Sequence, residues 1–365
     1  MKFQRVVLPL LVVLLAFLLS ACGTNTLAQG FPGLVFQDGT IYLTEGRHVY
    51  AVTASTGQEV RMGDAPLRFP AEADANINLY APVALTEDGQ IIFPNSHPSQ
   101  HQLYSIDPET GNVRWTFEKS KGTWIGGALS LGTDVYAPGG DGILYALDAS
   151  GNSRWTAELS KSGLWTHPVS DGKLIFQATM DGMLFALDPA DGRQVWQLDL
   201  DSPILGAPAV AEDGSLYLGT LSGILYAVDG ASGSVSWQQQ LEGSIWGTPA
   251  LSAENVYIGT LVKHAGKFYA IQRDNGAIQW QRDDEGSIIA GPLALEDQVL
   301  YVTELGRVQA LTSDGSPKWQ ADLKGKLVST PVLAGDVIVV APLQGETMLA
   351  AYDLNGAQRW TFKAE

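Results

Sequence analysis

Residues 144–155 read LYALDASGNSRW, and this stretch returns along the chain with small changes. It contains an apolar-Tyr-Ala-apolar-Asp run, a short polar segment, a glycine and a closing tryptophan. The other copies are LYSIDPETGNVRW (103–115), LFALDPADGRQVW (184–196), LYAVDGASGSVSW (225–237), FYAIQRDNGAIQW (268–280), VQALTSDGSPKW (308–319), LAAYDLNGAQRW (349–360) and VYAVTASTGQEV (49–60). The eighth of these lacks its tryptophan. Successive closing tryptophans lie 39 to 43 residues apart, so a repeated structural unit organises the chain.

Each unit has the pattern of four short β-strands. In stretches such as APAVAEDGSLYLGT (207–220), apolar and polar residues alternate around Asp-Gly, Glu-Asp or Ser-Gly turns, which is typical of strands joined in hairpins. Residues 30–365 divide into eight units of 42 residues, and a closed ring needs no special end units. The sequence therefore predicts an all-β fold, an eight-bladed β-propeller of four-stranded antiparallel blades. An insertion around Met62 to Ile77 is expected to form a surface loop.

The N-terminus predicts the compartment. Lys2 and Arg5 precede an apolar run and a small-residue site that ends in Cys22, the only cysteine of the chain. This order is typical of a secretory signal peptide, and residues 19–22 resemble the bacterial lipobox, whose cysteine is acylated. We expect a signal peptide over 1–21, a lipid-anchored tether over 22–29 and the propeller over 30–365. The alternative is a plain signal peptide or an uncleaved anchor.

The predicted compartment is extracytoplasmic, with Cys22 acylated (palmitate) in the cell membrane or, where the host has one, the outer membrane. Residues 1–21 contain two basic residues and no acid, so the formal charge of −17 becomes −19 after their removal. Nucleic acid and anionic headgroups attract positive charge, so nucleic acid is not expected as a partner. The membrane is expected to be contacted through the lipid, by a monomeric propeller.

The repeat resembles the tryptophan-docking motif of quinoprotein-type propellers, Ala-x-Asp-x-x-x-Gly-x-x-x-Trp. Its aspartate is matched by Asp107, Asp148, Asp188, Asp229 and Asp353, and its tryptophan by Trp115, Trp155, Trp196, Trp237, Trp280, Trp319 and Trp360. Glycine permits a positive φ in the turn, and tryptophan is large enough to pack against a neighbouring blade. The resemblance implies that these tryptophans have a structural role in holding the ring together.

That family has two functional branches. One contains dehydrogenases that hold pyrroloquinoline quinone (PQQ) and calcium, and the other contains non-catalytic propellers such as the BamB lipoproteins. Alcohol dehydrogenases of the first branch typically carry a vicinal cysteine pair, and a c-type haem needs Cys-x-x-Cys-His; the chain has neither. We expect no catalysis, no PQQ, no calcium or other metal, and an envelope protein as partner of an interaction or assembly scaffold. The alternatives are a PQQ-dependent dehydrogenase and a carbohydrate-binding surface protein.

An apolar ring is expected around one mouth of the propeller channel. Alignment of the units on an early proline, replaced by Gly127 in one unit, places Leu79, Trp124, Trp165, Leu205, Trp246, Ile289 and Val328 at one position. Trp124, Trp165, Trp246 and the nearby His167 are the candidate binding residues for a peptide, a sugar or a planar ligand. Alternatively, these side chains plug the channel or pack under loops. His97 and His101 are too few for a zinc site and are expected in a solvated loop.

Overall fold

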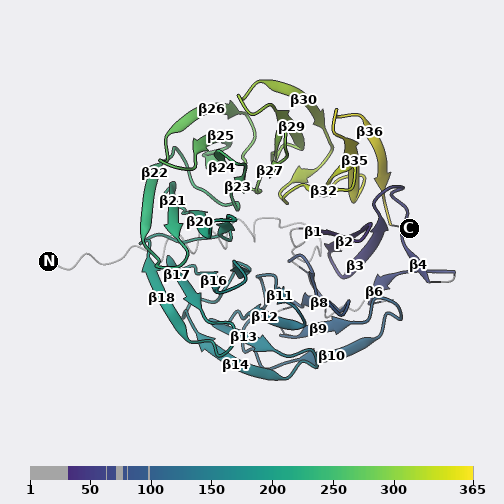
Figure 1. Cartoon of the computed structure of the whole chain (residues 1–365). Helices are drawn as coiled ribbons and strands as arrows, with labels where there is room; N and C mark the ends of the chain where they lie inside the picture. Colours follow the sequence, from purple (N-terminus) through teal and green to yellow (C-terminus); the bar gives the residue numbers. More distant parts are fainter. Residues whose placement is uncertain (1–31, 63, 71–76, 80, 98, 365) are drawn as a thin grey trace.

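The computed structural model describes residues 32–364 except 63, 71–76, 80 and 98. The predicted signal peptide, Cys22 and tether lie outside these residues. The described chain forms eight four-stranded antiparallel sheets that are arranged as blades around a central axis (Figure 1). The predicted fold class, an eight-bladed β-propeller, is therefore confirmed. No helix among the described residues is long and apolar enough to cross a membrane.

The blades follow one another in chain order, and within each blade we name the strands A to D from the channel outwards. Blade 1 consists of β1 (Gly33–Gln37), β2 (Thr40–Glu45), β3 (His48–Thr53) and β6 (Arg68–Phe69). Blade 2 consists of β7 (Ala84–Leu85), β8 (Ile91–Pro94), β9 (Leu103–Ile106) and β10 (Val113–Phe117). Blade 3 consists of β11 (Leu129–Leu131), β12 (Asp134–Pro138), β13 (Ile143–Leu147) and β14 (Ser153–Glu158). Blade 4 consists of β15 (Val169–Ser170), β16 (Ile175–Ala178), β17 (Met183–Leu187) and β18 (Gln194–Asp199).

The remaining blades repeat this order. Blade 5 consists of β19 (Ala209–Val210), β20 (Ser215–Gly219), β21 (Ile224–Asp229) and β22 (Val235–Gln240). Blade 6 consists of β23 (Ala250–Leu251), β24 (Asn255–Val262), β25 (Ala265–Gln272) and β26 (Ile278–Asp284). Blade 7 consists of β27 (Leu293–Ala294), β28 (Val299–Val302), β29 (Arg307–Leu311) and β30 (Pro317–Asp322). Blade 8 consists of β32 (Val332–Ala334), β33 (Val337–Val340), β35 (Leu349–Asp353) and β36 (Gln358–Phe362). Two small ladders lie outside the blades. One pairs β4 (Arg61–Met62) with β5 (Ala65–Pro66), and the other pairs β31 (Lys326–Leu327) with β34 (Pro342–Leu343).

The antiparallel order gives the ring two different faces. Strand A of every blade leads through an AB turn to strand B, so the AB and CD turns lie at one end of the blade and the BC turn lies at the other. The connection from strand D to the next blade starts at the BC end. We call the face with the AB and CD turns the docking face, and the face with the BC turns and the DA connections the connection face.

Seven tryptophans join neighbouring blades in the same way. The indole N–H of Trp196 in blade 4 donates a 2.8 Å hydrogen bond to the carbonyl of Gly230 in the CD turn of blade 5. Its ring lies against Gly233, where an added Cβ would come within 2.7 Å of the ring. The other six indoles donate equivalently: Trp115 to Ala149, Trp155 to Pro189, Trp237 to Arg273, Trp280 to Ser313, Trp319 to Leu354 and Trp360 to Ala54. Each of these seven interfaces is thus stabilised by a packed indole ring and by the hydrogen bond that its N–H donates to a carbonyl of the next blade.

Phe69 takes the place of the tryptophan that the first unit lacks. It lies on β6, which pairs with β3 through Val49 and Phe69, and its side chain is fully buried. A Cβ at Gly111, the motif glycine of blade 2, would lie 3.5 Å from the Phe69 ring. The predicted surface loop around 62–77 is therefore wrong in part. A buried aromatic was required at this interface, and the chain supplies it after the β4–β5 hairpin.

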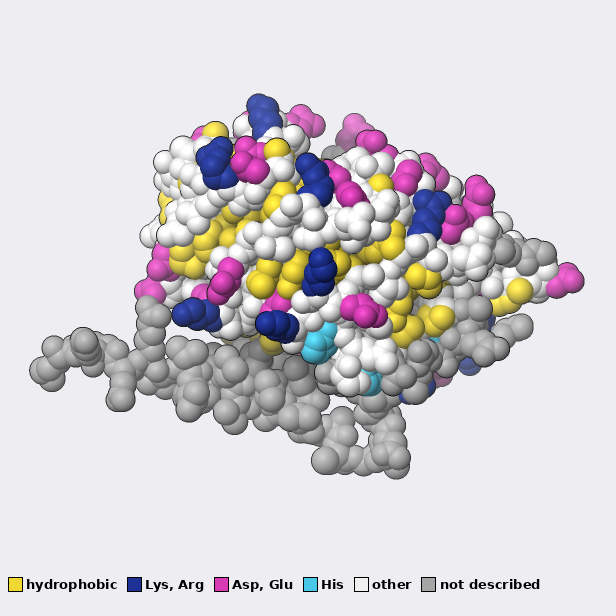
Figure 2. Space-filling model, turned by 90° about the horizontal axis from the view of Figure 1, so that it is seen from below, with side chains coloured by type: hydrophobic (Ala, Val, Ile, Leu, Met, Phe, Trp, Pro, Cys, Tyr) yellow, Lys and Arg dark blue, Asp and Glu magenta, His cyan; other side chains and the backbone are white. Residues whose placement is uncertain are grey.

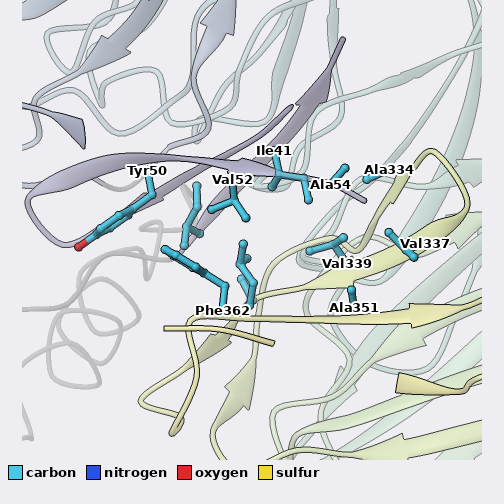
Figure 3. Packing of buried hydrophobic residues seen from close by; sticks show 12 residues of the cluster. Ile41, Tyr50, Val52, Ala54, Ala334, Val337, Val339, Ala351 and Phe362 are labelled. Atoms are coloured by element: carbon cyan, nitrogen blue, oxygen red, sulfur yellow. The ribbon is translucent and has the colours of Figure 1, made fainter. Parts of the chain in front are cut away.

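The ring closes through side chains. Among the described strands, blade 1 is built only from N-terminal strands and blade 8 only from C-terminal ones. Ile41 and Val52 of blade 1 pack in one buried cluster with Val339 and Phe362 of blade 8 (Figure 3). Trp360 spans this interface between blades 8 and 1, which we call the seam, by donating a 2.9 Å hydrogen bond to the Ala54 carbonyl. Buried apolar side chains and one docking tryptophan therefore stabilise the seam.

The D strands form the outer wall of the ring. Figure 2 shows hydrophobic side chains as a band along this wall, with charged side chains on both sides of the band. Exposed and less exposed residues alternate along β14, where Trp155 is half-buried. This alternation is expected for a strand with one face on the next blade and one face in solvent.

Candidate functional site

A cavity lies in the central channel, and it is the candidate functional site. Its volume is about 460 Å³, and it is open to solvent. Strands A of blades 2 to 5, with the residues just before them, form its wall. The lining residues are Ala84, Leu85, Ala128, Leu129, Ser130, His167, Pro168, Val169, Ser170, Pro208 and Val210. The wall is therefore mostly apolar and combines four segments that are far apart in the sequence.

His167 is the only titratable side chain in this lining. It comes two residues before β15 and so faces the channel at its connection-face end. Burial lowers the pKa of His167 below its usual value of 6.5, because desolvation disfavours the charged imidazolium. At neutral pH the ring is uncharged and offers one hydrogen-bond donor and one acceptor.

The two serines of the lining are already bonded within their own turns. The Ser170 hydroxyl donates a 2.7 Å hydrogen bond to the Leu174 carbonyl and accepts one from the Gly172 N–H. The Ser130 hydroxyl donates to the Gly132 carbonyl at 3.3 Å. Nucleophilic catalysis requires a hydroxyl within hydrogen-bond reach of a base. No such pair joins His167 to a serine in the described lining, so the arrangement suits binding of a small, largely apolar group.

The lining does not fit PQQ with a calcium ion. Calcium takes six to eight oxygen ligands, among which carboxylates are prominent, and the cavity wall contains no Asp or Glu. It also contains no Lys or Arg that would neutralise an anionic quinone. Within the described ranges, no three His, Cys, Asp or Glu side chains lie close enough together to hold a metal ion. His97 lies in the BC turn of blade 2, where its ring contacts the Ser99 hydroxyl at 2.9 Å.

Of the four candidate rim residues, only His167 lines the cavity. Trp124 is fully buried between blades 2 and 3, and its ring lies 5.8 Å from that of Tyr145. The prediction that Trp124 belongs to an accessible binding rim is therefore wrong. Trp165 and Trp246 are half-buried, and the structure does not bring the three tryptophans together around the cavity.

Strand register explains the misplacement of Trp124. In blade 4, Val169 pairs with Phe176 as the first residue of strand A, and in blade 3 the same place is taken by Leu129, which pairs with Tyr136. Ala128 therefore corresponds to Pro168, and the alignment on Gly127 is displaced by one residue. With the correct register, Trp124 corresponds to buried apolar residues in the other blades, namely Leu164, Ile204, Ile245, Ile288 and Leu327. Leu79 belongs to the same buried set.

Glu45 is a half-buried acid that the sequence pattern does not single out. It ends β2 at the BC turn of blade 1. Its Oε2 atom is buried and has no hydrogen-bond partner in the described part of the chain. Burial raises the pKa of Glu45 from 4.5 to about 7, because the charged form loses its hydration. Nothing in the repeat pattern distinguishes this glutamate, so only the fold reveals it.

We expect Glu45→Gln to stabilise the protein above pH 7 and to leave it unchanged at pH 4. The folded-state pKa of Glu45 lies above the unfolded value, so the protonated side chain favours the folded state. That contribution is complete below about pH 4.5 and is lost as the pH rises through about 7. Thermal melts of both proteins at pH 4 and pH 8 measure the effect. If Glu45→Gln changed the melting temperature by the same amount at both pH values, ionisation of Glu45 would not be the cause of the change.

Comparisons with known proteins agree with the architecture. The family model described as "Outer membrane protein assembly factor BamB" matches residues 23–163, 140–282 and 264–365. No curated protein sequence matches the chain. Among solved structures, BamB from Moraxella catarrhalis superposes with a TM-score of 0.71 at 19% identity, covering 86% of this chain and 93% of that one.

Two further structures share the fold at lower identity. The quinohemoprotein alcohol dehydrogenase ADHIIG from Pseudomonas putida HK5 gives a TM-score of 0.72 at 14% identity, covering 93% of this chain and 76% of that one. The computationally designed Ika8 protein gives a TM-score of 0.73 at 12% identity, covering 90% and 98%. At these identities the superpositions show the fold alone, which an enzyme and a designed protein share with this chain.

Proposed function

Since the chain belongs to the family described as outer membrane protein assembly factor BamB, we propose that it is a lipid-anchored extracytoplasmic propeller that serves as a non-catalytic scaffold for a protein of the cell envelope. The channel lining carries this proposal. A propeller that uses PQQ and calcium needs carboxylates around the ion, and this wall offers only apolar side chains, two serines and an uncharged histidine. Acylated Cys22 would hold the propeller at the membrane, since several acyl chains anchor a protein firmly.

A scaffold has surfaces available for partners outside the channel. The D strands leave one backbone edge each on the outer wall, and such edges can pair with a strand of another chain. Val113, Val195 and Val235 lie on or beside these strands and are between 40% and 53% exposed. The outer wall therefore offers both unpaired backbone and apolar side chains to a protein partner.

A cofactor titration and a cross-linking experiment test the proposal together. We expect PQQ with calcium, added to the purified protein, to give no absorbance shift and no dye reduction with alcohols or sugars. In intact cells, a photo-cross-linker at Val235 on the outer wall is expected to capture one defined envelope protein, and the same cross-linker on the unlipidated Cys22→Ala protein is the control. Dye reduction with PQQ would contradict the non-catalytic assignment. Failure to capture any envelope protein would contradict the scaffold.

A further inference from the structure

The described chain begins at the connection face, close to the channel. Gly33 is the first residue of β1 and pairs with Thr44, which lies next to the BC turn of blade 1. Its N–H donates a 3.0 Å hydrogen bond to the Thr44 hydroxyl, and the Pro32 carbonyl accepts a hydrogen bond from Ser329 in the connection between blades 7 and 8. The chain thus meets the innermost strand from the connection face, at a firmly held point.

The distance between this point and Cys22 is limited. Nine residues lie between Cys22 and Pro32, and the ten steps from one Cα to the other span at most about 35 Å when fully extended. To bring Cys22 to the docking face, the tether would have to run from Pro32 outwards across the four strands of a blade, which lie about 4.8 Å apart, and then along the height of the blade, roughly 20 Å. That path would use essentially the whole tether, so a lipid on Cys22 reaches a bilayer at the connection face with the least constraint.

The two faces differ strongly in charge. Every blade has an aspartate or glutamate in or beside its AB turn, and every blade has another in or beside the segment that joins strands C and D. Most basic side chains near this face already form ion pairs, for example Arg114 with Asp107 at 2.9 Å and Lys318 with Asp297 at 2.6 Å. An anionic lipid surface repels such a face within a Debye length of about 8–10 Å.

Most of the lysines without an ion pair in the described chain lie on the connection face, namely Lys119, Lys121, Lys161 and Lys263, and all four are exposed. Lys324 and Lys326 are also exposed there, but they pair with Glu346 and Glu304. The BC turn of blade 7 adds Leu305, which at 65% exposure is the most exposed large apolar side chain of the described residues. Lysine near an anionic headgroup is favourable, and an exposed leucine gains by entering the interface.

We infer that the connection face is held against the lipid bilayer and that the docking face points away from it into the aqueous compartment. The length of the tether and the charge of the faces lead independently to this orientation. The inference rests on the proposed lipid anchor at Cys22. It also assigns partners to the outer wall and the docking face, since the mouth of the channel on the connection face is turned toward the membrane.

Single cysteines can test this orientation, because the lipidated protein has no other thiol. In blade 7, Leu305→Cys places a label in the BC turn and Ser313→Cys places one in the exposed CD turn. Each lipidated protein is labelled with a fluorophore and bound to vesicles of phosphatidylcholine and phosphatidylglycerol that contain a headgroup-nitroxide lipid. We expect quenching to be several-fold stronger at position 305 than at position 313. Ser222→Cys and Ser232→Cys in the BC and CD turns of blade 5 form a second pair.

Equal quenching at both positions, or stronger quenching at 313, overturns the orientation. Flotation of the vesicles separates this result from failure of the anchor. If the protein does not float with the vesicles, the proposed lipidation fails, whereas floating protein with equal quenching refutes only the orientation. Cys22→Ala carrying the label at 305 is the matched control, and it is expected neither to float nor to be quenched.

Discussion

Trp360→Ala is expected to open the ring at the seam between blades 1 and 8. The indole of Trp360 fills the space beside Gly57 and donates to the Ala54 carbonyl. Removing a packed tryptophan costs about 3–5 kcal/mol, and the carbonyl also loses its partner. Because blade 8 is C-terminal and blade 1 is N-terminal, no chain segment connects β36 to β1, and the two blades can separate once the packed indole is lost. Hydrogen exchange is expected to accelerate in β1–β3 and β32–β36, together with a lower melting temperature.

Trp196→Ala is the matched control for the seam. Trp196 docks on blade 5 with the same geometry, but blades 4 and 5 are also joined by the chain between β18 and β19. We expect a similar loss of global stability and no faster exchange in blades 1 and 8. Trp360→Phe keeps the ring packing and removes only the N–H, so a loss of about 1 kcal/mol is expected. Unchanged protection of blades 1 and 8 in Trp360→Ala would show that apolar packing alone closes the ring.

The tryptophan repeat predicted the architecture because every copy meets the same neighbour. Each indole requires a turn carbonyl and a glycine on the next blade, so the spacing of Trp115, Trp155 and their successors reports the spacing of blades. The repeat did not predict the fourth strand of blade 1, β6, because this strand carries no tryptophan. Phe69 follows a hairpin insertion instead of closing its repeat directly, and only strand pairing with β3 reveals its role.

The channel was less accessible to sequence reasoning than the blades. Its wall joins strands A of four blades, and their side chains point to a common axis only after the ring has closed. Strands A are two or three residues long in blades 2 to 5, so alternation is too short to fix their register. For that reason alignment on a proline gives the wrong register at Gly127 and predicts a rim position for Trp124, which the structure places in the core.

Gly192→Ala is expected to destabilise the protein by about 3 kcal/mol or more. Gly192 is the motif glycine of blade 4 and has a φ of 74°, which costs a residue with a Cβ about 1–2 kcal/mol. The added Cβ would lie 2.4 Å from Cε3 of Trp155, so the indole must move away from its carbonyl partner on Pro189. Overpacking of this kind adds about 1–3 kcal/mol.

Gly172→Ala separates the two contributions within the same blade. Gly172 also has a positive φ, 85°, but nothing lies within 4 Å of an added Cβ. Its replacement should cost only the backbone term of about 1–2 kcal/mol, with no change in the environment of Trp155. Urea unfolding of both variants, followed by tryptophan fluorescence, measures the difference. Equal losses of unfolding free energy in the two variants would mean that Gly192 is needed only for the conformation of the turn. A larger loss in Gly192→Ala would show that Gly192 also provides the surface against which Trp155 of the preceding blade packs.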